Sequence, residues 1–314
     1  MSIRYSKTHI RTLFSIECEN GKCIKDYSCF QRESEILLMP STYFQVIGHN
    51  DQGNGLHIVH LKEIQPPFTL LQPPQGLELT YSTQPKELIL KNQGLRIENI
   101  SEIAQSLRGN KILKILDLGG NNITNESAQI LAESLLENGI LELLNIDGNE
   151  VEDNGIQAIA KVLEVNQSLT TLGIMDNRIR KKGAIALSEM LKVNKTLKLL
   201  NIGNNRIEND GCISIAESLK INNCLETLGL PGNNIGDSGA YALAEMLLMN
   251  KSLHFLNIDN NQINECGARA LSEAIQVNNT LKNFYIQDNQ ITDEGKTLLQ
   301  QAAKSNRNLR VFKM

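Results

Sequence analysis

Tryptophan is absent from this chain of 314 residues, and its aromatic residues are limited to six tyrosines and seven phenylalanines. Long apolar segments are missing as well. No stretch approaches the roughly 18 consecutive apolar residues of a transmembrane helix, so the sequence predicts no membrane span. The N-terminal segment lacks the apolar run of about 7–15 residues that marks a secretory signal peptide. Together these absences predict a cytoplasmic protein.

An excess of positive charge is also missing. The chain has 31 Lys and Arg residues against 35 Asp and Glu residues, which leaves a net charge of -4. Nucleic-acid binding depends largely on a basic surface, so we expect no nucleic-acid partner. Six cysteines are too few for a disulfide framework in a chain of this length. Cys18, Cys23 and Cys29 lack the closer spacing of a zinc site, and we expect no metal.

A repeating pattern with a constant period dominates the chain after residue 84. Each unit begins with L-x-x-L-x-L-x-x-N and continues with A-x-x-L-A-x-x-L, as in LETLGLPGNNIGDSGAYALAEMLLMNKS at positions 225–252. The register predicts eight full units and a final stub. Their first residues are Pro85, Leu113, Leu141, Leu169, Leu197, Leu225, Leu253, Leu281 and, for the stub, Leu309.

The spacing within a unit predicts one short strand followed by one helix. Leu228 and Leu230 are two residues apart and lie on one side of a strand, whereas Leu243 and Leu247 share one helix face. A single unit cannot bury both faces, so units must stack with a parallel sheet inside an arc and helices outside. This pattern resembles leucine-rich repeats of the ribonuclease-inhibitor type. The resemblance implies an α/β solenoid over residues 85–314 that binds a protein on its concave face.

Three series of residues keep the period and indicate structural roles. The first holds asparagines after each strand, where the amide can satisfy backbone groups; these are Asn121, Asn149, Asn177, Asn205, Asn233, Asn261 and Asn289. The second is expected at helix ends in a left-handed conformation and contains Asn110, Asn138, Asn166, Asn194, Asn222, Asn250, Asn278 and Asn306. Glycines mark each turn into a helix, at Gly155, Gly183, Gly211, Gly239, Gly267 and Gly295.

Side chains at positions 2, 3, 5, 7 and 8 of each unit should project from the concave face, and they vary between units. Phe255, Tyr285 and His254 occupy such positions in adjacent units, so we expect them to anchor a protein partner. The alternative is that Phe255 and Tyr285 simply pack on each other across neighbouring strands. Asp259 and Asp288 lie nearby at the rim, where acids influence the association rate.

The segment before the repeats, residues 1–84, has a different composition. It contains eight of the thirteen aromatic residues, and residues 64–85 contain five of the seven prolines. Short β-type runs read IRTLFSIE, EILLMP, TYFQVIG and LHIVHLKEI. We therefore predict a small mainly-β domain over residues 1–63, a proline-rich linker over residues 64–84 and the solenoid over residues 85–314.

One segment of the β domain, DYSCFQRESEILLMPSTYFQVIG, resembles the C-terminal part of arginine-type mono-ADP-ribosyltransferase domains. The resemblance implies that Glu35 holds the nicotinamide ribose of NAD as the catalytic glutamate and that Glu33 orients the acceptor guanidinium. Such domains also place an NAD-gripping Arg and a Ser-x-Ser strand before this motif. The segment before Glu33 contains neither.

Two functions follow from these patterns. The first is a protein-interaction module attached to an incomplete transferase-like domain. The second is an NAD-dependent protein-arginine mono-ADP-ribosyltransferase whose repeats select the target protein. A truncated gene model, a degenerate enzyme and a reused binding fragment all remain open as explanations of the segment before the linker.

Overall fold

The structure is a computed structural model that describes residues 86–314 and, before them, six strands between residues 2 and 64. The chain divides into two units, Met1–Leu79 and Thr80–Met314, and each is described by itself. Glu33, Glu35 and the proline-rich residues 65–85 lie outside the described residues.

The N-terminal unit contains a four-stranded sheet in the order β1-β2-β6-β5. β2 and β6 are parallel, whereas β1–β2 and β5–β6 are antiparallel. β3 and β4 form a separate antiparallel pair. The bounds are β1 Ser2–Tyr5, β2 Arg11–Glu17, β3 Lys22–Cys23, β4 Ile36–Leu37, β5 Tyr43–Asp51 and β6 Leu56–Ile64. The predicted runs IRTLFSIE, TYFQVIG and LHIVHLKEI are confirmed as β2, β5 and β6, and β4 covers two residues of EILLMP; β1 and β3 were not predicted.

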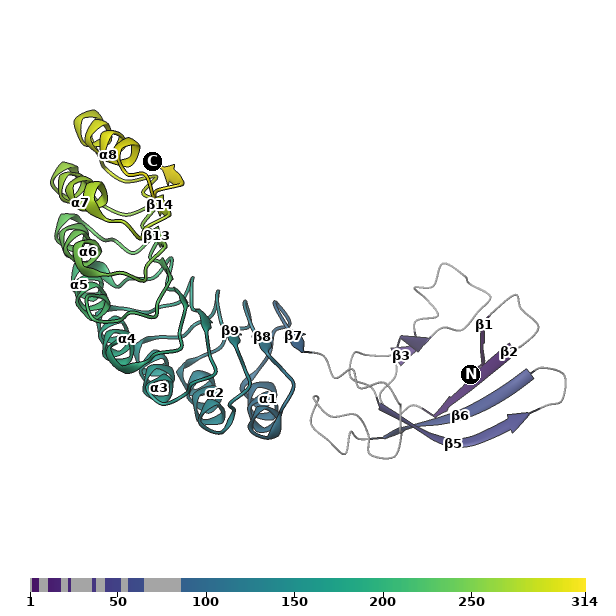
Figure 1. Cartoon of the computed structure of the whole chain (residues 1–314). Helices are drawn as coiled ribbons and strands as arrows, with labels where there is room; N and C mark the ends of the chain where they lie inside the picture. The colour runs from purple at the N-terminus through teal and green to yellow at the C-terminus, as the bar shows by residue number, and fades with distance from the viewer. Residues whose placement is uncertain are drawn as a thin grey trace. The chain divides into compact units, whose positions relative to one another are not determined.

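The second unit alternates short strands with helices, which confirms the predicted α/β solenoid (Figure 1). Its nine strands form one parallel sheet in chain order, with the helices on the outer side of the arc. The strands are β7 Glu87–Ile89, β8 Ile115–Asp117, β9 Leu143–Asn145, β10 Thr171–Gly173, β11 Leu199–Asn201, β12 Thr227–Gly229, β13 Phe255–Asn257, β14 Asn283–Tyr285 and β15 Val311–Lys313. The helices are α1 Ile97–Gly109, α2 Asn125–Glu137, α3 Asp153–Leu163, α4 Lys181–Val193, α5 Glu208–Leu219, α6 Asp237–Met249, α7 Glu265–Val277 and α8 Asp293–Ser305.

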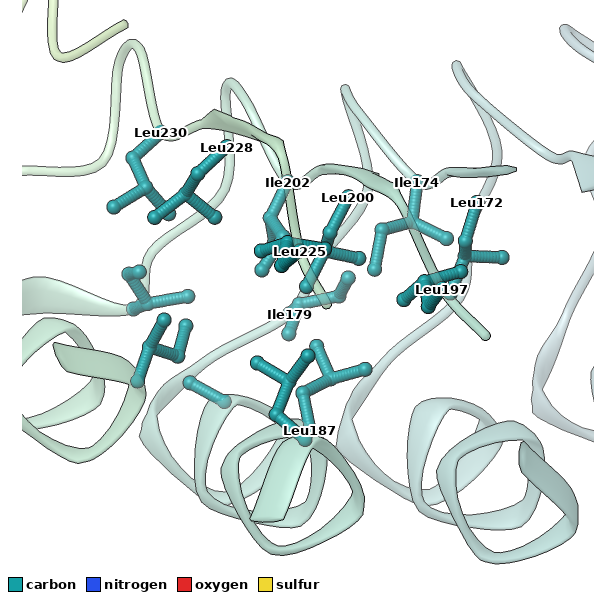
Figure 2. Packing of buried hydrophobic residues seen from close by; sticks show 14 of the residues in the cluster. Leu172, Ile174, Ile179, Leu187, Leu197, Leu200, Ile202, Leu225, Leu228 and Leu230 are labelled. Carbon is teal, nitrogen blue, oxygen red and sulfur yellow. The ribbon is translucent and has the colours of Figure 1, made fainter. Parts of the chain in front are cut away.

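The core lies between the sheet and the helices (Figure 2). The middle residue of a strand points inward and stacks on its counterparts, so Leu200 pairs in register with Leu172 and Leu228. All three leucines are fully buried, and Leu187 and Ile215 belong to the same core from the helix side. Burying one such side chain stabilises the fold by about 1.5–3 kcal/mol. Because each unit shares its core with both neighbours, stability accumulates along the stack.

The first asparagine series satisfies the backbone as each strand ends, as predicted. The side-chain amide of Asn205 donates to the carbonyl oxygens of Ile174, Ile202 and Gly203, each at 3.0 Å. Its Oδ1 accepts the Ile179 amide at 3.0 Å. The bond to the preceding unit recurs in all seven members of the series. These asparagines therefore join adjacent turns of the solenoid.

The second asparagine series has a different role from the one predicted. None of its eight members has a positive φ, so the expected left-handed conformation is wrong. Asn194 shows what happens instead: its Nδ2 donates to the Leu163 carbonyl of the preceding unit at 2.7 Å. Its Oδ1 accepts the amides of Thr196 and Leu197 at 2.9 and 2.8 Å. The side chain thus satisfies a carbonyl at the end of the preceding helix, which removes the need for a left-handed cap.

The glycine series allows each helix to pack closely on its neighbours. A Cβ on Gly239 would lie 2.6 Å from Ile235 Cγ2 and 3.0 Å from Asn209 Oδ1. Gly239 also donates its amide to Asn209 Oδ1 at 3.0 Å. The absence of a side chain therefore brings the start of α6 against the preceding repeat.

Candidate functional site

The concave face of the sheet is formed by the first and third residues of each strand, which are partly exposed in most strands while the middle residue is buried. The first residue is apolar in five of the nine strands, namely Ile115, Leu143, Leu199, Phe255 and Val311. We call these five side chains the concave row. Of these five side chains only Phe255 was predicted as a binding residue; the four aliphatic members of the row were not. The register of the repeats was the signal that could have found it.

Phe255 and Tyr285 lie side by side on the concave face. The register of β13 and β14 places Asn257 beside Tyr285, so Phe255 is its diagonal neighbour. The ring centroids are 5.1 Å apart, with the planes tilted by 33°. Lys313 Nζ lies 5.3 Å from the centroid of the Tyr285 ring. We call Phe255, Tyr285 and Lys313 the aromatic platform, and the predicted stacking across strands is present in it.

His254 comes directly before Phe255 and is partly buried. Its Nδ1 is shielded from solvent and has no hydrogen-bond partner in the described part of the chain. Its neighbour Glu226 lies 3.0 Å from Lys198 Nζ. The hydrogen bond from Lys198 is the main reason that the pKa of Glu226 is lowered, and His254 and Lys282 add a smaller electrostatic contribution. A charged group thus borders the aromatic platform.

The two predicted rim acids both have local structural roles. Asp259 Oδ1 accepts the Gln287 amide of the next unit at 2.6 Å, and burial raises the pKa of its carboxyl group. Asp288 has a left-handed backbone with φ of 53°. Short polar residues and glycine tolerate that conformation best, which explains this residue type at the turn after the strand. These local roles leave the predicted effect of Asp259 and Asp288 on the rate of association with a partner as a prediction.

A second group of acids lies at the other end of the face. Asp147 Oδ1 accepts the Met175 amide at 2.6 Å. Burial raises the pKa of Asp147 most, and the nearby Asp117 and Asp176 raise it further. Among residues 86–314, no three His, Cys, Asp or Glu side chains are arranged to hold a metal ion.

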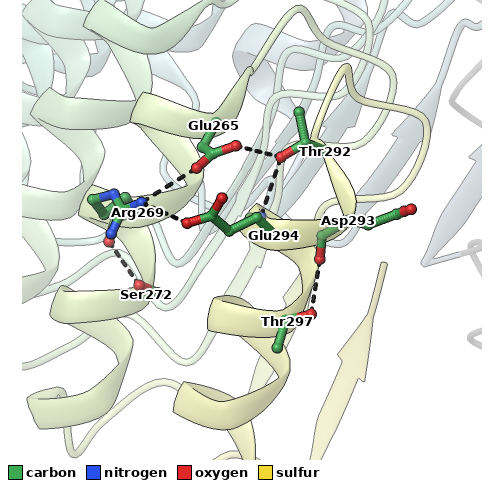
Figure 3. Close-up of polar contacts among 8 residues, drawn as sticks. Glu265, Arg269, Ser272, Thr292, Asp293, Glu294 and Thr297 are labelled. Carbon is green, nitrogen blue, oxygen red and sulfur yellow. Dashed lines mark hydrogen bonds and ion pairs between the residues drawn. The ribbon is translucent and has the colours of Figure 1, made fainter.

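Polar side chains on the last two helices are paired with each other. Arg269 lies between Glu265 and Glu294 (Figure 3), and its Nη2 is 3.2 Å from Glu265 Oε1 and 3.3 Å from Glu294 Oε1. The hydroxyl of Thr292 bonds to Glu265 and accepts the Gly295 amide at 3.3 Å, which caps α8. This network joins α7 to α8, and its polar groups are engaged with one another.

A row of aliphatic side chains follows the edge where the helices end. Its members recur once per repeat and are more than half exposed; they are Val165, Val193, Ile221, Met249 and Val277. These residues were not predicted as a group, although their constant place in the repeat is visible in the sequence. No helix in the described part of the chain is long and apolar enough to cross a membrane.

Comparison with known proteins agrees with the geometry of the repeats. A family model described as "Leucine Rich repeat" matches residues 109–132, 140–160, 165–188, 193–216, 222–244 and 277–296. No curated protein sequence matches the chain.

Solved structures include two similar chains. One, described as Leiomodin-1 Actin-Binding Site 2, is 25% identical and covers 42% of this chain and 78% of its own, with a TM-score of 0.38. Another, the tropomodulin C-terminal domain from Caenorhabditis elegans, is 17% identical and covers 48% of this chain and 92% of its own, with a TM-score of 0.41. Scores this low identify no partner. The strand-helix register and the six family matches together establish that the chain carries leucine-rich repeats stacked into a solenoid.

Proposed function

We propose that the solenoid is a protein-interaction module and that its concave face binds the partner. The observation that carries this proposal is the aromatic platform, which shares Phe255 with the apolar concave row and lies on a sheet face that no helix of the solenoid covers. Partly exposed aromatic residues supply much of the binding energy in protein interfaces.

The platform is suited to binding because its members already hold each other. Phe255 and Tyr285 pack at 5.1 Å in the free protein, so little side-chain freedom remains to be lost when a partner binds. Lys313 lies over Tyr285 and adds a positive charge at the edge of the contact. A partner with an apolar side chain flanked by an acidic one fits this arrangement.

The test begins with the full chain as bait to recover a partner from cell extract, followed by direct binding with the purified partner. Phe255→Ala and Tyr285→Ala should each weaken binding by about 2 kcal/mol, roughly thirtyfold. Glu273→Ala is the matched control because Glu273 is exposed on an outer helix and makes no ion pair within residues 86–314. If both aromatic variants keep their melting temperature and bind like the wild type, the platform is not the binding site.

A second candidate is the NAD-dependent protein-arginine mono-ADP-ribosyltransferase implied by the resemblance of the N-terminal segment. This candidate rests on the sequence DYSCFQRESEILLMPSTYFQVIG alone, because Glu33 and Glu35 lie outside the described residues. We propose that this segment is transferase-like but that this chain does not transfer ADP-ribose by itself. The reason is that the NAD-gripping Arg and Ser-x-Ser elements are missing from the sequence before Glu33.

Incubation with labelled NAD and a guanidinium acceptor tests this second proposal. We expect no labelled product from the wild-type chain. Labelled product that disappears in Glu35→Ala would show instead that the chain is an active transferase, with Glu33→Ala separating acceptor selection from catalysis.

We further propose a cytoplasmic location, because Cys212, Cys224 and Cys266 are all free thiols, as a reducing compartment favours.

A further inference from the structure

A small hollow lined by arginines lies where β10 and β11 lead toward α4 and α5. It has a volume of about 210 Å³, and its lining residues are Asn177, Arg178, Arg180 and Arg206. We call it the arginine hollow. It belongs to the fourth and fifth units, whereas the aromatic platform belongs to the seventh unit and those after it, so the two sites share no residue.

Backbone pairing between adjacent repeats brings these arginines close together. Arg180 and Arg206 form an isolated parallel β-bridge, so their backbones run side by side. The Arg206 amide donates to the Ile179 carbonyl at 2.8 Å, and the Arg178 amide donates to the Val151 carbonyl at 2.9 Å. The same bonds that stack the repeats therefore hold three arginines around one hollow.

Charge pairing accounts for only part of this cluster. Arg178 pairs with Glu150 at 3.2 Å, and Lys181 pairs with Asp210 at 2.5 Å. Asp153 Oδ1 also lies near the hollow, where it accepts the amides of Arg180 and Gly183, both at 2.8 Å. Three exposed cations of this cluster have no ion pair among residues 86–314, namely Arg180, Lys182 and Arg206.

The other repeats show that the fold does not require cations at the start of a helix. Of the eight helices after residue 85, α4 alone has no acidic residue in its first turn, and it carries Lys181 and Lys182 there. The remaining helices have at least one acid in that turn, including Asp153 in α3 and Glu208 in α5. Acidic residues stabilise the start of a helix and basic residues do not, so helix stability does not explain why α4 begins with lysines.

We propose that the arginine hollow binds the phosphate group of a phosphorylated side chain on a partner protein. A phosphate dianion offers three acceptor oxygens, and guanidinium groups bind such oxygens through paired N–H donors. Arginine clusters are a recurrent means of recognising phosphorylated segments. A protein partner fits better than a membrane, because the row of exposed aliphatic side chains lies along the helix ends and none of those residues lines the hollow.

The test measures binding of the full chain to dye-labelled pentapeptides of sequence Gly-Gly-Ser-Gly-Gly, with the serine either phosphorylated or free. We expect the phosphopeptide to bind at least tenfold more tightly and to lose affinity as salt increases. The Arg180→Ala/Arg206→Ala double variant should lose at least tenfold in affinity. Arg180→Lys/Arg206→Lys should fall between that variant and the wild type, because lysine keeps the charge but loses the paired donors.

The matched control removes two exposed cations from the helix-end edge, as Lys251→Ala/Arg307→Ala, and should bind the phosphopeptide like the wild type. Equal binding of both peptides, or an equal loss in the control variant, would overturn the proposal. Vesicles containing a phosphoinositide provide the other arm. Binding to those vesicles that needs Arg180 and Arg206, without binding to the phosphopeptide, would assign the hollow to a membrane and also overturn it. Unchanged melting temperatures would show that the variants remain folded.

Discussion

The two faces of the solenoid sheet belong to the same strands but differ in how constant their residue types are from unit to unit. One face packs against the helices, and we call it the inner face. On it, the middle residue of the strand is leucine from β7 to β13 and phenylalanine in β14 and β15. On the concave face, the first residue of the strand changes from charged to aliphatic, polar or aromatic between units. The inner face repeats because every unit must fit its neighbours. The concave face is under no such packing constraint, so it can carry recognition.

The same contrast separates two asparagines of one repeat. Asn205 is buried and makes four hydrogen bonds, of which the two to Ile174 and Ile179 join it to the preceding unit. Asn201 lies on the concave face, where its Oδ1 accepts the Gly203 amide at 3.3 Å. The contribution of an asparagine to stability therefore depends on its burial and on the number of backbone groups that it bonds.

The largest expected difference between the faces comes from Leu200 and Lys198. Leu200→Ala should lower the free energy of unfolding by about 2–5 kcal/mol, because it leaves a cavity between units. Lys198 is half exposed and pairs with Glu226, so Lys198→Ala should stay within about 0.5 kcal/mol of the wild type. Chemical denaturation of both variants measures the difference. Equal losses would mean that the assignment of inner and concave faces is wrong.

A smaller difference is expected between the two asparagines. Asn205→Ala should cost about 1–3 kcal/mol, because it leaves buried backbone groups without partners. Asn201→Ala should cost less than about 1 kcal/mol, since one long hydrogen bond is lost at a partly exposed site. Thermal melts of the two variants provide the comparison. A larger loss for Asn201 would show that the concave face also holds the repeats together.

The smallest effect concerns a charge on the concave face and depends on pH. Burial raises the pKa of Asp147 in the folded protein, so its carboxylate destabilises the fold once it is ionised. The protonated side chain of Asp147 favours the folded state. This contribution to stability is complete below the pKa of Asp147 in the unfolded chain and is lost as the pH rises through its higher pKa in the folded protein. Asp147→Asn should therefore be more stable than the wild type at pH 7, with the gain shrinking toward pH 4. Urea titrations at both pH values measure this, and a gain that grows in acid would contradict the assigned shift.

The repeat register, the strand-helix order and the inner core could be predicted from the sequence because stacking imposes a period that can be counted. The same register placed Phe255 and Tyr285 on one face, and their contact is confirmed. The role of the second asparagine series was predicted wrongly, since a bond from Asn194 to the preceding unit depends on how the units stack. The arginine hollow was missed for the same reason: Arg180 and Arg206 come from different repeats and meet only when the solenoid forms.

Site-specific photo-crosslinking tests the central claim, that the concave face binds the partner, most directly. A photoreactive phenylalanine analogue would replace Phe255 on the concave face in one protein and Glu273 on the outer helices in another. With the purified partner at equal concentration, we predict a crosslinked product from position 255 and none from position 273. A product from position 273 alone would place the interface on the helices and contradict the proposal.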